Sequence, residues 1–199
     1  MQIRLTNYKA QVLIPVLGLL WAVSSWMLSM IWGYGLLQGT GPTAIVLGLL
    51  FCYDRWLWKF PVFSMLNTIP NLNGYYEGEI KYCFKGQDDT KKCELIIKQT
   101  CSNIKIDCTF NKDKERMTKS VSTEAFIKTD EIGDQFLYFY YHNPGSCLNG
   151  DTLDSHDGMN VLRILKDKKQ IKLDGYYFTN RNPQTKGVLT VTRINGGGK

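Results

Sequence analysis

The sequence contains little of what metal-dependent or nucleophilic enzymes require. Only two of its 199 residues are histidines, and neither His142 nor His156 stands at metal-ligand spacing from a cysteine pair. No CxxC, HExxH, phosphate-cradling P-loop or nucleophile elbow occurs. Asp154 and Asp157 flank His156, but neighbouring loop residues do not converge on one reacting atom without a scaffold. We therefore predict no catalytic residue, no metal site, no cofactor and no enzymatic activity.

The larger part of the chain also lacks an excess of charge of either sign. The formal net charge of +6 divides into +3 up to Pro70, from four cations and one anion, and +3 after it, from twenty cations and seventeen anions. This near balance argues against a general polyanion binder, so we expect no DNA or RNA partner. A small anionic ligand held by one or two placed cations stays open.

Charge is missing altogether from Val12 to Trp32, which is long enough for a helix that crosses a bilayer. A second apolar run, Thr43–Tyr53, reaches that length by including Trp56, Leu57 and Trp58, residues typical of a membrane interface. A cleaved signal peptide is disfavoured because the first run is too long and a second follows it. A buried soluble hairpin is disfavoured because the rest of the chain has no spare apolar face. We expect a transmembrane helical hairpin in residues 1–66, with helices at about 12–32 and 43–60.

The cations near these runs predict the topology. Arg4 and Lys9 precede the first helix, Arg55 and Lys59 follow the second, and the link between the helices carries no charge. By the positive-inside rule, both ends of the hairpin face the cytoplasm. Because that compartment is reducing, we expect the cysteines of the following domain to be mostly free thiols. These are Cys83, Cys93, Cys101, Cys108 and Cys147.

Small residues recur at three- and four-residue steps in both helices, and such stripes let helices approach closely in lipid. One interpretation is that the two stripes face each other inside the hairpin. The other is that at least one stripe is an interface between subunits. The residues are Gly18, Ala22, Ser25 and Ser29 in the first helix, and Ala44 and Gly48 in the second.

From residue 67 to 199 the pattern changes to period two, which predicts β-strands bounded by Gly, Asn, Asp and Lys clusters. Eight strands with short links favour a compact antiparallel up-and-down β-barrel, because closure removes the exposed edges of a sheet. A compact sandwich is the alternative fold. The fold class is thus a membrane-anchored all-β protein. The expected strands are Tyr75–Phe84, Cys93–Thr100, Asn103–Phe110, Met117–Ile127, Phe136–His142, Asn160–Leu165, Ile171–Asn180 and Gly187–Arg193.

Two strands carry the candidate ligand-binding residues. Alternation places Tyr76 and Gly78 on one inward face, and Gly inside a strand often marks a bend or the close approach of a ligand. The second strand places Tyr177, Thr179 and Arg181 on the inward face. Guanidinium binds phosphate and a tyrosine ring stacks on a base, so the set suits a small nucleotide. Lys186 could bind the same anion or be a turn lysine, and Arg181 could instead lie in solvent beside an acid.

The run Phe136–His142 is aromatic on both faces. One face belongs to the core, and the other indicates a cover, either a second subunit or the membrane surface.

Together these features resemble the two-transmembrane, β-strand-rich effectors of CBASS-type cyclic-oligonucleotide anti-phage signalling in bacteria. The resemblance covers nearly the whole chain and includes the helix pair with its uncharged link. Tyr76 stands where the family pattern often has Trp, which keeps an aromatic ring but alters the pocket. The motifs are Ile69-Pro70-Asn71-Leu72-Asn73-Gly74 running into Tyr76-x-Gly78, and Leu173-x-Gly175-x-Tyr177-x-Thr179-x-Arg181 followed by Lys186-Gly187-Val188-Leu189.

The resemblance implies an anti-phage defence effector whose barrel binds a cyclic dinucleotide. Binding would make the helices oligomerise and disrupt the bacterial inner membrane, which kills the infected cell. The implied partners are the messenger, the lipid bilayer and other copies of the chain. A membrane-tethered, lipocalin-like carrier of an apolar ligand and a structural membrane component with a filled barrel are the alternatives. The base identity, the ring linkage, the sign of the ligand effect, the oligomer size and the form of the lesion stay open.

Overall fold

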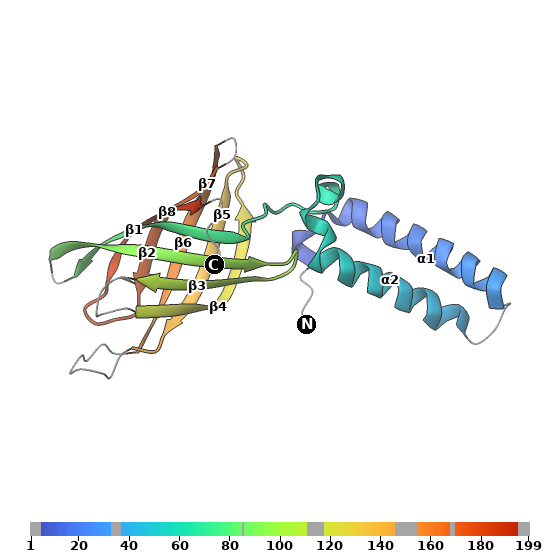
Figure 1. Cartoon of the computed structure of the whole chain (residues 1–199), viewed down its shortest axis with the longest axis horizontal. Coiled ribbons are helices and arrows are strands. Elements are labelled where there is room, and N and C mark those ends of the chain that lie inside the picture. The colour runs from blue at the N-terminus through green and yellow to red at the C-terminus, as the bar shows by residue number, and fades with distance from the viewer. Residues whose placement is uncertain are drawn as a thin grey trace. The chain divides into compact units, whose positions relative to one another are not determined.

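The chain is described here by a computed structural model, which covers residues 5–32, 37–84, 86–110, 118–145, 155–167 and 170–194. It divides into two compact units. One comprises Met1–Asn71 with Thr100–Asn103, and the other comprises Leu72–Gln99 with Ile104–Lys199. The first is helical and the second is a β-barrel (Figure 1).

The described residues of the helical unit form two long helices and three short 3-10 helices. α1 spans Ala10–Trp32, close to the expected 12–32, but α2 spans Leu37–Arg55, so the expected 43–60 is wrong at both ends. α2 starts earlier than expected for two reasons. Pro42 is its sixth residue and removes only one backbone hydrogen-bond donor. The packing that buries Pro42 also outweighs the low helix propensity of the Gly and Pro residues in this part of α2. α2 ends at Arg55 because Trp56 leaves the helical conformation (φ −129°, ψ −49°), and the extended Phe60 before Pro61 then ends the short helix η2. The 3-10 helices are η1 Leu5–Asn7, η2 Leu57–Lys59 and η3 Pro61–Leu66.

One helix in the described part of the chain is long and apolar enough to cross a membrane. It covers 22 residues, Ala10–Ile31, within α1. α2 falls short of that standard because it begins with Gln, Gly, Thr and Pro among its first residues and ends with Asp54 and Arg55. Both helices nonetheless expose large apolar side chains, including Leu19 and Met30 in α1 and Leu47 in α2.

The small residues do not pack between the two helices. Leu13 and Ser24 are buried, whereas Gly18, Ala22, Ala44 and Gly48 are exposed. A Cβ atom added at Gly18 or Gly48 would meet no atom within 4 Å. The interpretation that the stripes face each other inside the hairpin is therefore wrong. Ser25 and Ser29, on the same stripe of α1, are partly exposed.

Buried polar groups close one end of the helical unit. Tyr8 Oη donates a hydrogen bond to Asp54 Oδ1 at 3.0 Å, and the Asp54 carbonyl accepts the Cys101 N–H at 3.0 Å. The Asn7 amide donates to the Cys101 carbonyl at 2.7 Å. Asp54 is only 2% exposed, so these bonds replace its water contacts. Asp54 is thus a structural residue rather than part of an apolar span.

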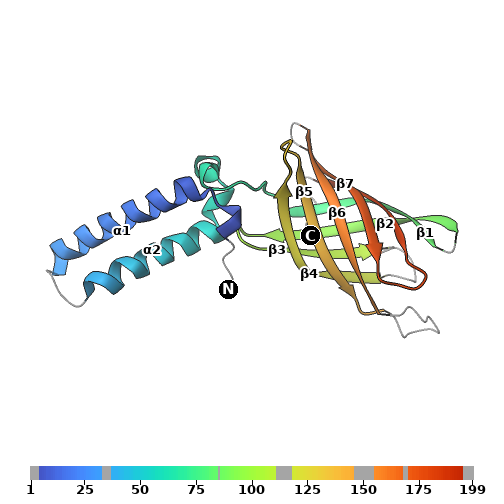
Figure 2. The same ribbon diagram turned by 180° about the vertical axis from the view of Figure 1, so that it is seen from behind.

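The other unit is a closed antiparallel barrel in which each strand pairs with the next and β8 pairs with β1. The predicted eight-stranded barrel is confirmed, and the sandwich alternative is wrong. In Figures 1 and 2, the antiparallel strands β1–β4 are drawn close to horizontal, and the ribbons of β5–β7 slope steeply across them. The strands are β1 Gly74–Phe84, β2 Gln87–Gln99, β3 Ile104–Phe110, β4 Thr118–Thr129, β5 Gln135–Asn143, β6 His156–Asp167, β7 Gln170–Thr179 and β8 Lys186–Ile194.

Apolar side chains on the inward face of each strand fill most of the barrel. Leu95, Leu137, Leu162 and Leu173 are fully buried, and these strands alternate with exposed positions as the period-two pattern predicts. An eight-stranded barrel is just wide enough for side chains to fill it or to leave room for one small ligand. Any ligand site inside the barrel must therefore lie beyond the part that these apolar side chains fill.

Five cysteines lie among the described residues and all are free thiols, while Cys147 lies outside those residues. Burial raises the pKa of the Cys108 thiol to about 12, which lowers its thiolate fraction at neutral pH. At pH about 8 we expect iodoacetamide to modify the half-buried Cys83 in the folded protein before it modifies the buried Cys93 and Cys108. Peptide mapping checks this order. Equal labelling of Cys83 and Cys108 before unfolding would contradict the placement of Cys108.

Candidate functional site

A cavity of about 120 Å³ opens at the end of the barrel where β1, β3, β5 and β7 finish. We call this end the mouth. The side chains around the cavity include four tyrosine or phenylalanine rings, the imidazole of His156 and two full cations, and none of its described lining residues is acidic. The four rings are Tyr82, Phe110, Tyr141 and Tyr177, the cations are Lys91 and Arg181, and the smaller polar residues are Ser120, Asn143, Thr179 and Thr185.

The period-two alternation of β7 positions the predicted residues Tyr177 and Thr179 at this cavity. Tyr177 is 6% and Thr179 3% exposed, whereas Phe178 between them faces outward. Arg181 follows one turn residue later and also lines the cavity. The structure thus brings together three of the six residues predicted to bind ligand.

Hydrogen bonds to Thr179 Oγ1 hold the turn after β7. This oxygen accepts the N–H of Thr185 at 3.2 Å and the N–H of Arg181 at 3.4 Å, and its hydroxyl donates to the Thr185 carbonyl at 3.3 Å. All the bonding capacity of this hydroxyl is used within the turn. Thr179 therefore positions Arg181, and its own hydroxyl is not available to a ligand.

Thr185, which the sequence pattern did not identify, differs from Thr179 because its hydroxyl makes no hydrogen bond. Its hydroxyl is buried at the cavity and has no hydrogen-bond partner in the described structure. An unpaired buried hydroxyl is unfavourable by about 1–3 kcal/mol. A polar ligand atom in the cavity would remove this penalty, so Thr185 points to a ligand independently of the charges.

The tyrosine side chains at the cavity are neutral phenols. Burial raises the pKa of both Tyr141 and Tyr177, and the nearby Arg181 guanidinium lowers each by a smaller amount. The Tyr141 ring also covers Gly158, because a Cβ there would lie 2.3 Å from Tyr141 Oη. Arg181 thus stands close to two rings that present flat faces and hydroxyl donors.

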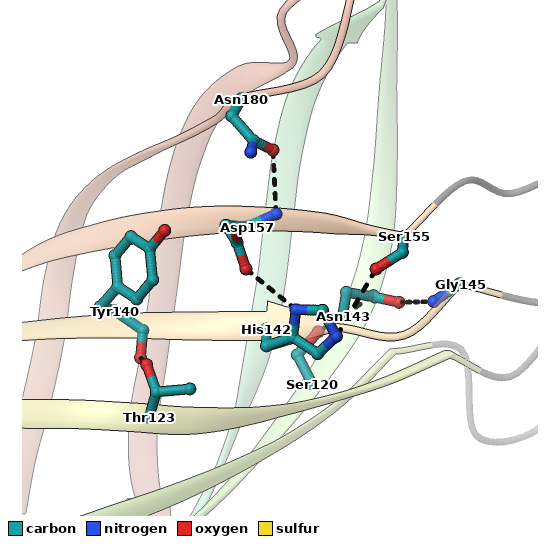
Figure 3. Close-up of polar contacts among 9 residues, drawn as sticks. All are labelled: Ser120, Thr123, Tyr140, His142, Asn143, Gly145, Ser155, Asp157 and Asn180. Atoms are coloured by element: carbon teal, nitrogen blue, oxygen red, sulfur yellow. Dashed lines mark hydrogen bonds and ion pairs between the residues drawn. The ribbon is translucent and has the colours of Figure 1, made fainter.

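Asn143 and Ser120 form a buried polar pair beside the rings. The Asn143 amide donates to Ser120 Oγ at 3.0 Å, and Asn143 Oδ1 accepts the Gly145 N–H at 2.9 Å (Figure 3). Both residues line the cavity and are at most 5% exposed. The inward-facing positions of β5 are Leu137, Phe139, Tyr141 and Asn143. The change from apolar residues to an amide at the last of these positions is the sequence signal that could have identified Asn143 as a site residue.

Hydrogen bonds between neighbouring strands stiffen the rim of the mouth. Asp157 Oδ1 contacts His142 Nδ1 at 2.9 Å, and the Asp157 N–H donates to Asn180 Oδ1 at 2.9 Å (Figure 3). Asn180 also donates its backbone N–H to the Asp157 carbonyl at 3.0 Å. These contacts join β5, β6 and the residue before Arg181. His142 and Asp157 therefore hold the rim, and no group of three or more metal-ligating side chains gathers among the described residues.

The other three predicted ligand residues lie elsewhere. Tyr76 is fully buried in the core, and its hydroxyl donates to the Leu72 carbonyl at 2.9 Å. Gly78 admits the backbone of β8, since a Cβ there would lie 2.0 Å from the Thr190 carbonyl oxygen. Lys186 is exposed and pairs in register with Cys83 and Phe178. Gly78 therefore allows the close approach of strand β8 and not of a ligand.

Comparison with protein families matches residues 67–193 to the Cap15 cyclic dinucleotide receptor domain. The match covers the described barrel except Ile194, the last residue of β8, and well over half of the chain. The chain belongs to the Cap15 family. This membership confirms the resemblance to CBASS-type effectors that the sequence motifs indicated.

Two relatives agree with the Cap15 assignment. CD-NTase-associated protein 15 of Yersinia aleksiciae is 31% identical over 151 residues, which cover 75% of this chain and 68% of the relative. The protein of the same name from Staphylococcus schleiferi is 29% identical over 89 residues, 45% of each chain. Cap15 is a receptor family rather than a class of enzymes.

The two threonines at the mouth give a matched test of this site. Thr185→Val removes a hydroxyl that has no partner, so we expect unchanged or slightly higher thermal stability. It should weaken ligand binding by about 0.5–1.5 kcal/mol, roughly 2- to 10-fold. Thr179→Val removes three hydrogen bonds and should lower stability instead. Calorimetric melting and ligand titration measure both. Equal destabilisation by the two changes would contradict the conclusion that the Thr179 hydroxyl holds the turn and the Thr185 hydroxyl does not.

Proposed function

We propose that the chain is a CBASS effector that binds a cyclic dinucleotide at the mouth of its barrel and responds by assembling and disrupting the membrane. One observation carries the ligand part: a cavity lined by two cations, four tyrosine or phenylalanine rings and an unpartnered hydroxyl, with no acidic residue among its described lining. Membership of a family named for cyclic dinucleotide reception supports the same ligand class.

The chemistry of a cyclic dinucleotide fits these side chains group by group. The Arg181 guanidinium offers paired donors to a phosphate, and Lys91 offers a second positive charge. Tyr141 and Tyr177 offer faces for a base. Asn143 and Thr185 offer an amide and a hydroxyl to its polar edge.

The cavity volume constrains how such a ligand binds. Drug-sized ligands occupy pockets of roughly 300–1,000 Å³, whereas the described cavity holds about 120 Å³. We infer that one base enters the barrel while the phosphates stay at the mouth beside Arg181. The links 111–117 and 146–154, which join strand ends at the mouth, lie outside the described residues.

The helical unit supports the membrane part of the proposal. Large apolar side chains cover the outside of α1, where Ile14, Leu19 and Met30 are each at least 66% exposed, and exposed patches of this kind mark contact with lipid or protein. The exposed small residues Gly18 and Gly48 leave room for a helix of another copy. We propose that both helices cross the bacterial inner membrane, that both chain ends are cytoplasmic, and that ligand-driven self-association opens the lesion.

Titration of the full chain in detergent micelles tests the ligand class. We expect saturable heat with at least one of cyclic di-AMP, cyclic di-GMP and cyclic di-UMP, and none with oleate. Binding of oleate alone would favour the apolar-carrier alternative and overturn the proposal. Absence of binding by every probe, together with no growth arrest on expression, would favour a purely structural role.

A further inference from the structure

The outer surface of the barrel carries two apolar areas besides the cavity, and the first of them shares Tyr82 and Tyr177 with the cavity's lining. The first is a groove of about 860 Å³ across β7, β8, β1 and the start of β2. We call it the outer groove; the outward side chains that line it include Lys81, Cys83, Asp88, Tyr176, Phe178 and Lys186. Tyr176 is 55% and Phe178 40% exposed, so none of the described residues covers these rings.

The second area is the outward side of β4 and β5, which we call the aromatic face; its residues are Phe126, Phe136, Tyr138 and Tyr140. The rings of Phe126 and Tyr138 stack with centroids 5.1 Å apart and planes 7° from parallel. Phe126 is 39% and Tyr140 45% exposed. A contiguous exposed aromatic area of this kind on a soluble barrel marks an interaction surface.

The two areas lie on opposite sides of the barrel. In the closed order β1 to β8, the seam between β4 and β5 is four strands away from the seam between β8 and β1 in either direction. A surface that fits a different surface on the opposite side of an identical copy makes a heterologous contact. Such contacts repeat to form rings or open chains rather than closed dimers.

Their charges are complementary. Exposed Glu124 and Lys128 flank Phe126 on the aromatic face, and exposed Lys186 and Asp88 stand at the outer groove. Lys186 and Asp88 are both in register with Cys83, so two strand spacings separate them, about 10 Å. Glu124 and Lys128 are four residues apart on β4, about 13 Å. Long side chains can bridge the difference between these two spacings, so Glu124 can reach Lys186 while Lys128 reaches Asp88.

We propose that the aromatic face of one copy docks in the outer groove of the next, with Glu124 against Lys186 and Lys128 against Asp88. This contact deepens the proposed function, because it names the barrel surface through which copies assemble. It also lies beside the ligand site: Tyr177 and Thr179 face the cavity from β7 while Tyr176 and Phe178 face the groove from the same strand. A ligand that shifts β7 shifts the groove.

Site-specific crosslinking of the full chain in detergent tests the contact. Thr123→Cys places a thiol beside Glu124, and Cys83 is already in the outer groove. Mild oxidation should give a ladder of dimers, trimers and larger species on a denaturing gel. The ladder should vanish when Cys83→Ser is added. Crosslinking that stops at the dimer would overturn the head-to-tail arrangement.

Charge reversal separates this contact from a folding effect. In the Thr123→Cys background, Glu124→Lys or Lys186→Glu alone should reduce the ladder at least tenfold. Combining both changes in one chain, or mixing the two single variants, should restore it. Failure of both rescues would overturn the contact. Loss of binding to anionic phospholipid vesicles, with the ladder unchanged, would overturn it in favour of a membrane surface.

The same variants distinguish this proposal from the ligand proposal. Glu124 and Lys186 do not line the cavity, so cyclic dinucleotide affinity, measured at protein concentrations too low for assembly, should stay within twofold of the unmodified chain. A ladder without any nucleotide binding would refute the proposed function and leave the contact standing. Nucleotide binding without a ladder would refute the contact and leave the proposed ligand standing.

Discussion

Replacing Arg181 with alanine should weaken cyclic dinucleotide binding roughly 10- to 150-fold. In the proposed complex the change removes a charge-assisted hydrogen bond from Arg181 to phosphate, a contact of about 1.5–3 kcal/mol. The barrel should keep its stability, because Arg181 lies in the turn after β7 and is only partly buried. Its position depends on its backbone N–H, which alanine retains. Titration calorimetry measures the affinity and circular dichroism the melting temperature.

Two variants control for this effect. Lys186→Ala removes a cation from the exposed outer side of β8, five residues away, and should leave ligand affinity unchanged. Arg181→Lys keeps the charge but loses the fork of donors, so it should recover only part of the affinity. If Lys186→Ala weakened binding as much as Arg181→Ala, long-range charge rather than contact at the cavity would explain both.

Replacing Gly18 with leucine should abolish the growth arrest that we propose the full chain causes, while leaving ligand affinity intact. Gly18 is exposed on α1 and a Cβ there meets nothing within 4 Å, so the hairpin itself can accept the larger side chain. A second copy packed closely on the stripe cannot, because small residues are what allow backbones to approach in lipid. Colony counts after induction measure the arrest.

Val23→Leu is the matched control for that variant. Val23 is exposed on α1 at 44% but lies off the stripe of Gly18, Ala22, Ser25 and Ser29. It adds bulk and apolar surface to the same helix without touching the small residues. Growth arrest should persist in this variant. Arrest that persists equally in Gly18→Leu would show that the stripe is not an assembly surface.

The barrel was accessible to sequence reasoning because strand alternation is local. Side chains two apart share a face, so the buried positions Leu173, Tyr177 and Thr179 follow from the pattern alone. The limits of α2 were less accessible, because packing of Pro42 outweighed its low propensity to continue a helix.

The candidate site was only partly accessible to sequence reasoning for a different reason. Alternation says which way a side chain points but not how far along the barrel the apolar filling extends. Tyr76 and Tyr177 are equivalent by pattern, yet Tyr76 bonds to Leu72 within the packed core and Tyr177 lines the cavity. Thr185 lies in a turn, where no periodicity applies, and only the fold reveals that its hydroxyl is buried.

By itself the sequence determined an apolar helical segment followed by eight alternating strands, since both depend on interactions between residues near each other along the chain. Only the tertiary structure decided that Arg181, Tyr141 and Thr185 share one cavity, that Lys186 faces away from it, and that Gly18 and Ala22 of α1 are exposed. The reason is that the closing of β8 onto β1 and the packing of α1 against α2 join residues far apart in the chain, and no local pattern records their depth or their neighbours.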